Sequence, residues 1–173
     1  GHTPNMQLPW SGEVLDMMSA ALGCDARGLL PGLWCDIGDM TSRVRYAFMD
    51  TVTKLYDKNF CTQIGDWCRA HNVEYMGHVI EENNANTCVG MGTGHYFRSL
   101  WGQDLAGIDV VLSSLVPGIK GASHTWEPQL YEADDDFFYY ELAQLATSLA
   151  HIDPKKHGRA MCEIFGAYGW QEG

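Results

Sequence analysis

The order in which helical and strand patterns follow one another is the strongest constraint on the fold of this chain. Residues 41–72 form the longest periodic segment, and their regular apolar positions predict one long helical face. That face consists of Val44, Phe48, Val52, Leu55, Phe60, Ile64, Trp67 and Cys68. The segment leads directly into residues 73–83, VEYMGHVIEEN, whose β-branched and aromatic start is typical of a buried strand. A helix that feeds a strand in this way indicates parallel βα units.

The remaining segments repeat the alternation. Ser11 is expected to cap a helix that Gly23 ends. The later segments predict, in order, a short helix, a strand, a helix and a strand, at residues 95–103, 105–116, 137–150 and 159–170. We therefore expect an α/β fold of the (β/α)8 TIM-barrel type.

Only a portion of such a barrel is expected in this chain. A closed eight-stranded barrel typically needs about 250 residues, and the chain has 173. Residues 1–173 are accordingly predicted to form one partial barrel domain that belongs to a longer, multidomain enzyme. Open strand edges in a partial barrel predict association, either with the remaining barrel segments or with further copies of the chain.

Charge and hydropathy exclude several classes of partner. The net charge is −11 and the few basic residues are scattered, which argues against a nucleic acid or an anionic membrane surface as partner. No apolar run approaches the about 20 residues of a membrane span, and no signal-peptide pattern opens the chain. A soluble chain is predicted, whose compartment stays open because a signal removed from a longer parent would leave no trace.

Six cysteines raise the question of disulfides. Cys61 and Cys68 are seven residues apart on one predicted helical face, where two turns of rise separate them too far for a bridge. No CxxC pair of the kind used by zinc sites occurs. We expect reduced, buried, structural thiols at Cys24, Cys35, Cys61, Cys68, Cys88 and Cys162.

Carboxylates at two predicted strands indicate the chemistry. Glu81 and Glu82 end the apolar run of residues 73–83, and Glu163 lies inside the predicted strand RAMCEIFGAYGW. Barrel folds gather their chemistry at the carboxyl ends of strands. Two strands that each present a Glu suggest paired-carboxylate catalysis, of which glycoside hydrolysis is the commonest example.

Three motifs resemble the barrel domain of large bacterial glycoside hydrolases. They are GHVIEEN after WCRAHNVEY, then GHYFRSLWGQDLAGIDVV, then AMCEIFGAYGW, and the resemblance extends from about Trp10 onward. The family compared is that of the family 106 α-L-rhamnosidases and their uncharacterised relatives. The resemblance implies a barrel flanked by β-sandwich domains, hydrolysis of a terminal rhamnoside-like sugar from a polysaccharide or glycoside with inversion, and a calcium-assisted site. Calcium ligands are not identifiable among the matched residues, so the metal stays open.

The same resemblance assigns roles to two carboxylates. Glu81 would be the catalytic acid and Glu163 the base. Strand alternation instead places Glu82 on the same face as His78. Because strand ends often bulge near active sites, Glu81 is the first choice for the acid and Glu82 the second.

Four further residues are candidates for binding the carbohydrate. His78 would bond a sugar hydroxyl or the carboxyl of the catalytic acid, or serve as a core histidine. His95 would line the mouth of the site or cap the helix that follows it. Trp126, in a long loop beside His124, is a candidate platform for a sugar ring. A second class of function stays open, in which the chain is a non-catalytic carbohydrate-binding or assembly fragment whose carboxylates only bond sugar hydroxyls.

Overall fold

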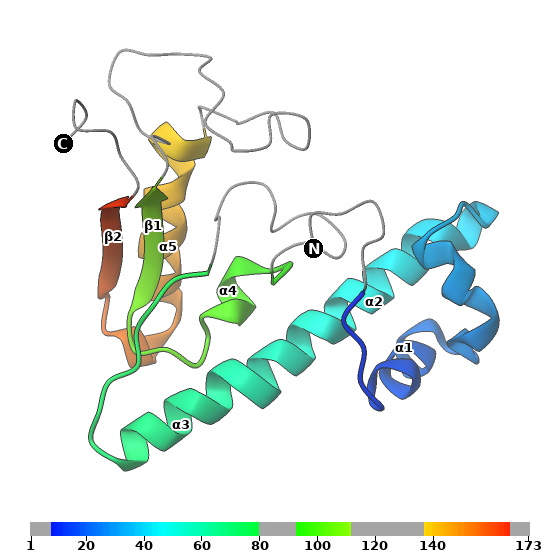
Figure 1. Cartoon of the computed structure of the whole chain (residues 1–173), viewed down its shortest axis with the longest axis horizontal. Helices are drawn as coiled ribbons and strands as arrows, with labels where there is room; N and C mark the ends of the chain where they lie inside the picture. Colours follow the sequence, from blue (N-terminus) through cyan, green and yellow to red (C-terminus); the bar gives the residue numbers. More distant parts are fainter. Residues whose placement is uncertain (1–7, 80–92, 112–136, 167–173) are drawn as a thin grey trace.

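The computed structural model describes residues 8–79, 93–111 and 137–166 (Figure 1). Helices dominate the first of these ranges. They are α1 (Val14–Leu22), two 3-10 segments (Ala26–Leu33 and Gly38–Met40), α2 (Thr41–Tyr56), a π-helical segment (Asp57–Thr62) and α3 (Gln63–Ala70). Figure 1 shows α2 and α3 as one long rod, with α1 packed against its beginning.

The other two ranges carry a short sheet and its covering helices. Their elements are α4 (Tyr96–Ser99), β1 (Ala106–Val111), a π-helical segment (Phe137–Glu141), α5 (Leu142–Ile152), a 3-10 turn (Pro154–Lys156) and β2 (Ala160–Gly166). β1 and β2 are parallel, with Asp109 paired with Glu163. The expected strands at these positions and their parallel direction are confirmed. In the described ranges the sheet has two strands, so the (β/α)8 barrel stays a prediction.

The long helix predicted over residues 41–72 is confirmed in extent, but its apolar face is not continuous. Val44 and Phe48 are fully buried, whereas Phe60 and Trp67 are 47% and 61% exposed. Between these pairs, the π-helical segment adds a residue to the turn and rotates the positions that follow. Cys61 is buried instead of Phe60. The prediction that Phe60 and Trp67 share the buried face was therefore wrong.

The ends of α1 test the two expected caps. Gly23 ends the helix with a left-handed φ of 72°, and its N–H donates to the carbonyl of Ser19 at 2.9 Å, as predicted. Ser11 does not cap with its side chain. Glu13 stands at the N-cap with helical backbone angles, and the carbonyl of Ser11 accepts from the N–H of Val14 at 3.2 Å. The turn at the start of α1 thus uses a backbone bond where we expected a hydroxyl.

Residues 73–79 differ from the prediction. They run alongside β1 in Figure 1, where Gly77 approaches Gly107, but they form no strand in the structure. The N–H of Asp104 donates to the carbonyl of Tyr75 at 2.7 Å, and the N–H of Tyr75 donates to the Asp104 carboxylate at 2.8 Å. The N–H of Tyr75 thus bonds a side-chain carboxylate, where in a β-sheet it would bond the backbone carbonyl of a neighbouring strand. The strand predicted to begin at Val73 is therefore wrong for the described part of that segment.

Two hydrophobic cores hold the chain together. One lies between α1 and α2 and includes Met18 and Phe48. The other packs α5 onto β1 through Ile108, Leu142 and Leu149. Figure 1 shows α5 behind β1, which leaves the opposite face of the strand pair without a covering helix among the described residues. In the described ranges, the helices are too short or too polar to cross a membrane.

The described cysteines are free, as expected, but Cys61 alone among them is buried, and Cys68 is half-buried. Cys24 and Cys35, which follow helix ends, and Cys162, on β2, are exposed. Cys61 is buried, and this burial raises the pKa of its thiol, which keeps it unreactive. Cys88 lies outside the described residues.

Candidate functional site

Three ionisable side chains from three segments meet beside the strand pair. His78 comes from the extended residues 73–79, Asp109 from β1 and Glu163 from β2. The Nε2 atom of His78 lies 3.3 Å from Oε2 of Glu163 and 3.9 Å from Oδ2 of Asp109. One potential ligand atom from each residue lies within 4.8 Å of the others. We call this set the carboxylate–histidine cluster.

Strand geometry explains why the two carboxylates meet. Asp109 and Glu163 are paired in the parallel register, so their side chains leave the sheet on one face. Ile108 and Val110, the neighbours of Asp109, are buried in the core with α5. Asp109 consequently points away from α5, toward the face that no described helix covers.

Gly107 explains how His78 reaches the same face. A Cβ atom at Gly107 would collide with the carbonyl oxygen of Gly77. Because glycine has no side chain, residues 77 and 78 can pass close to β1 at this point. The hydroxyl of Tyr96 donates to the Gly107 carbonyl at 2.7 Å and so fixes this part of the strand.

The two carboxylates have unequal environments. The side chain of Asp109 is 13% exposed, whereas that of Glu163 is 60% exposed. Burial raises the pKa of Asp109; the adjacent His78 lowers it, and the nearby Glu163 carboxylate raises it further. Asp109 therefore holds a proton more readily than an ordinary aspartate, while Glu163 stays open to solvent.

The orientation of His78 directs one nitrogen at both carboxylates. Its Nδ1 atom lies 2.9 Å from the carbonyl oxygen of Val79. With Nδ1 donating to that carbonyl, Nε2 faces Asp109 and Glu163. In the protonated imidazolium, Nε2 carries the second ring proton and donates it to a carboxylate. In the neutral imidazole, Nε2 offers its lone pair to a bound cation.

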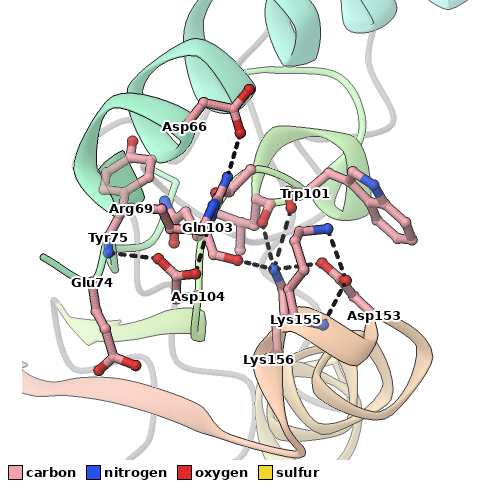
Figure 2. A network of polar contacts seen from close by, with 12 residues as sticks. Asp66, Arg69, Glu74, Tyr75, Trp101, Gln103, Asp104, Asp153, Lys155 and Lys156 are labelled. Atoms are coloured by element: carbon pink, nitrogen blue, oxygen red, sulfur yellow. Dashed lines mark hydrogen bonds and ion pairs between the residues drawn. The ribbon is translucent and has the colours of Figure 1, made fainter. Parts of the chain in front are cut away.

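A buried polar network lies at the starts of the segments that carry the cluster (Figure 2). Asp104, 8% exposed, accepts from the N–H of Tyr75 at 2.8 Å and from Nη1 of Arg69 at 3.0 Å. The same guanidinium donates to the carbonyl of Gly102 at 3.0 Å and to Asp66 at 2.8 Å. The end of α3, residues 73–79 and the approach to β1 are thereby joined.

Lys156 extends this network to β2 (Figure 2). Its side chain is fully buried, and Nζ donates to the carbonyls of Leu100 and Gln103 at 2.9 and 2.5 Å and to the Asp153 carboxylate at 3.0 Å. These bonds join the turn before β1 to the turn before β2. We call the bonds around Asp104 and Lys156 the strand-start network, and infer that it fixes the relative positions of His78, Asp109 and Glu163.

The structure brings together two of the residues singled out from the sequence, His78 and Glu163. His95 caps α4, because its Nδ1 accepts from the N–H of Arg98 at 3.4 Å, which is the second of the two roles considered for it. Burial lowers the pKa of His95. Four other candidates lie outside the described residues: Glu81, Glu82, His124 and Trp126.

Asp109 is the member of the cluster that the sequence analysis missed. A signal was present, since it is the one charged residue in the apolar run LAGIDVVLSSLV. A carboxylate inside a strand that is otherwise apolar requires either a partner or a function, because an unpaired buried charge is costly.

Comparisons with known proteins give no independent assignment. No family model matches the chain, and neither a curated protein nor a solved structure matches it. A functional hypothesis for this protein therefore rests on the geometry of the cluster and on the sequence motifs alone.

Proposed function

We propose that this protein is a glycoside hydrolase that removes a terminal, rhamnoside-like sugar from a polysaccharide or glycoside. One observation carries the proposal: Glu163, which stands in the motif AMCEIFG, lies beside His78 and a second carboxylate, Asp109. Enzymes of this class cleave the glycosidic bond with two carboxyl groups, one as acid and one as base or nucleophile.

Glu163 is the proposed base. Its carboxylate is mostly exposed, so a water molecule can approach it and give up a proton while attacking the anomeric carbon. His78, donating from Nε2, would hold that carboxylate in one orientation at 3.3 Å. The buried Asp109 would in turn restrain the imidazole from the other side.

The acid is proposed to come from a different segment. Inverting enzymes hold their carboxyl groups roughly 6.5–9.5 Å apart to leave room for the water. Asp109 and Glu163 approach within 4.8 Å, which is too close for that arrangement. The resemblance to the rhamnosidases favours Glu81 as the acid, with Glu82 second, and both follow closely on His78 in the chain.

The exposed edge of the sheet favours a second candidate function. Ile164 on β2 is 56% exposed, although parallel strands are usually covered on both faces. A carbohydrate-binding or assembly fragment that associates through this edge would explain the exposure without any catalysis. Such a fragment would elute above the monomer mass on size exclusion and would turn over no substrate.

Hydrolysis of an aryl α-L-rhamnoside separates the two functions. Glu163→Gln removes the charge but keeps the shape, and we expect it to lower the rate at least about 100-fold. Glu141→Gln is the matched control, because Glu141 is an exposed residue at the N-cap of α5 and is not a member of the cluster. The rates are compared in the complete barrel enzyme to which this chain is predicted to belong. Equal rates in the two variants, or no turnover by that enzyme, would contradict the proposal.

A further inference from the structure

We propose that His78, Asp109 and Glu163 bind a divalent transition-metal ion of the Zn²⁺ type. The inference concerns the same side chains as the proposed hydrolysis, but it rests on their geometry and does not require that activity. The two uses alternate, because Nε2 of His78 either donates a proton to Glu163 or gives its lone pair to the ion. Each ligand comes from a different segment, so the site exists only in the folded chain.

The distances within the cluster suit a single ion. Zinc binds imidazole nitrogen and carboxylate oxygen at about 2.0–2.2 Å, which places neighbouring ligand atoms roughly 3–4 Å apart. The Nε2 atom of His78 lies 3.3 Å from Glu163 and 3.9 Å from Asp109. The three atoms lie within 4.8 Å of one another, so small side-chain rotations would bring them to bonding distance.

The imidazole has the orientation that metal-binding histidines adopt. Such residues usually donate their second ring N–H to a backbone carbonyl or carboxylate, which fixes the ring and increases its basicity. Nδ1 of His78 lies 2.9 Å from the carbonyl of Val79, outside the cluster, and Nε2 is thereby aimed at both carboxylates. This contact is independent of the two acidic residues and itself points to an acceptor or a cation at Nε2.

Electrostatic repulsion between the carboxylates also favours a cation. Like charges at paired positions of adjacent strands destabilise a sheet, and Asp109 and Glu163 occupy such positions. Asp109 is largely buried, where an excess of negative charge is more costly than at the surface. An ion with two positive charges would balance both carboxylates at once.

The ligand types select the class of ion. Calcium prefers six to eight oxygen ligands, whereas one imidazole with two carboxylates suits zinc and neighbouring transition metals. Three protein ligands leave a coordination position open, as in catalytic zinc sites. Glu163 is 60% exposed, so the ion can enter from solvent.

Calorimetric titration of the untagged full chain with ZnCl₂ tests the inference. We expect one ion per chain, with affinity that falls as the pH is lowered because a proton competes for Nε2. His78→Gln should weaken binding by more than the roughly 10–100-fold typical of a lost outer-shell partner. His151→Gln is the matched control, since Nδ1 of His151 lies 2.7 Å from the carbonyl of Thr147 but His151 is not in the cluster. Equal affinities in the two variants would overturn the inference, as would binding of CaCl₂ in preference to ZnCl₂.

A second variant guards against misfolding of the first. Glu163→Gln changes an exposed residue, so it should keep the circular dichroism spectrum of the unmodified chain and still lose Zn²⁺ affinity. Full affinity in this variant would contradict the site. Activity assays of the complete barrel enzyme separate the two proposals: Zn²⁺ binding without glycoside cleavage refutes only the hydrolase, and glycoside cleavage without Zn²⁺ binding refutes only the metal site.

Discussion

The two ends of the strand region use similar residues for opposite purposes. In the strand-start network, each buried carboxylate has a cationic partner: Asp104 has Arg69, and Asp153 has Lys155 and Lys156. In the carboxylate–histidine cluster, two carboxylates share one imidazole. Among the described residues, the first end is balanced in charge, whereas the second has more carboxylates than cationic groups.

The pKa shifts follow this difference. Burial alone would raise the pKa of Asp153, but hydrogen bonds from Lys155 and Lys156 outweigh it, so the pKa is lowered. Burial also raises the pKa of Asp109, and there the opposing His78 does not cancel it, so the pKa stays raised. A buried charge that has a partner can stay ionised inside a fold, whereas strongly perturbed pKa values are typical of sites that bind a ligand or transfer a proton.

The largest effect is expected at Lys156. Lys156→Met removes the buried one of the two cationic partners of Asp153 and leaves the carbonyls of Leu100 and Gln103 without this donor. Breaking a buried ion pair from one side typically costs about 3–5 kcal/mol, and we expect a decrease of that size in the free energy of unfolding measured with urea. Lys155→Met is the control, because Lys155 is 39% exposed. Similar losses for both lysines would show that the network is not organised around Lys156.

Gly107→Ala should have the next largest effect. The added Cβ collides with the Gly77 carbonyl, and overpacking of this kind typically costs about 1–3 kcal/mol. Because His78 follows Gly77 directly, Zn²⁺ affinity should fall as well. Gly28→Ala is the matched control, since a Cβ there meets nothing within 4 Å. A stable Gly107→Ala chain with unchanged Zn²⁺ affinity would show that the close passage does not position His78.

Asp153 and Asp109 should respond to pH with opposite signs. The folded pKa of Asp153 is below 3.8, so its contribution to stability is present above pH 3.8 and is lost as the pH falls through the folded pKa. The folded pKa of Asp109 is above 3.8, so its ionisation reduces stability as the pH rises through the folded pKa. At pH 7 we expect Asp153→Asn to lower the free energy of unfolding and Asp109→Asn to raise it. Urea titrations at pH 7 and below pH 3.8 measure both free energies of unfolding. If both variants changed the free energy in the same direction at pH 7, the strand-start network and the cluster would not differ in the way proposed.

The sequence predicted the elements better than it predicted their contacts. Periodicity found the long helix and the strands β1 and β2, because these patterns are local. It placed Phe60 and Trp67 on the wrong side, because the π-helical segment between α2 and α3 has no marker in the apolar pattern. The strand predicted from Val73 was wrong for a related reason. The Asp104 side chain that accepts from the N–H of Tyr75 lies 29 residues later in the chain, so no local pattern reveals this bond.

The candidate site was also found in part. His78 and Glu163 were identified because they stand in distinctive motifs at predicted strands. Asp109 was missed because its importance comes from its register with Glu163, which no local pattern gives. Lys156 was missed for the same reason, since the carbonyls that it binds lie more than 50 residues earlier.

The smallest effect is expected for an exposed pair at the same end as the strand-start network. Arg159 binds Glu74 through both terminal nitrogens, with Nη1 3.1 Å from Oε2, and this contact lowers the pKa of Glu74. Solvent screens such pairs, so Glu74→Gln should leave the urea midpoint nearly unchanged, and Zn²⁺ affinity should also be preserved. A loss comparable with that of Lys156→Met would mean that the exposed pair and the buried bonds act as one unit. Arg159 would then belong to the strand-start network and would help to position Glu163.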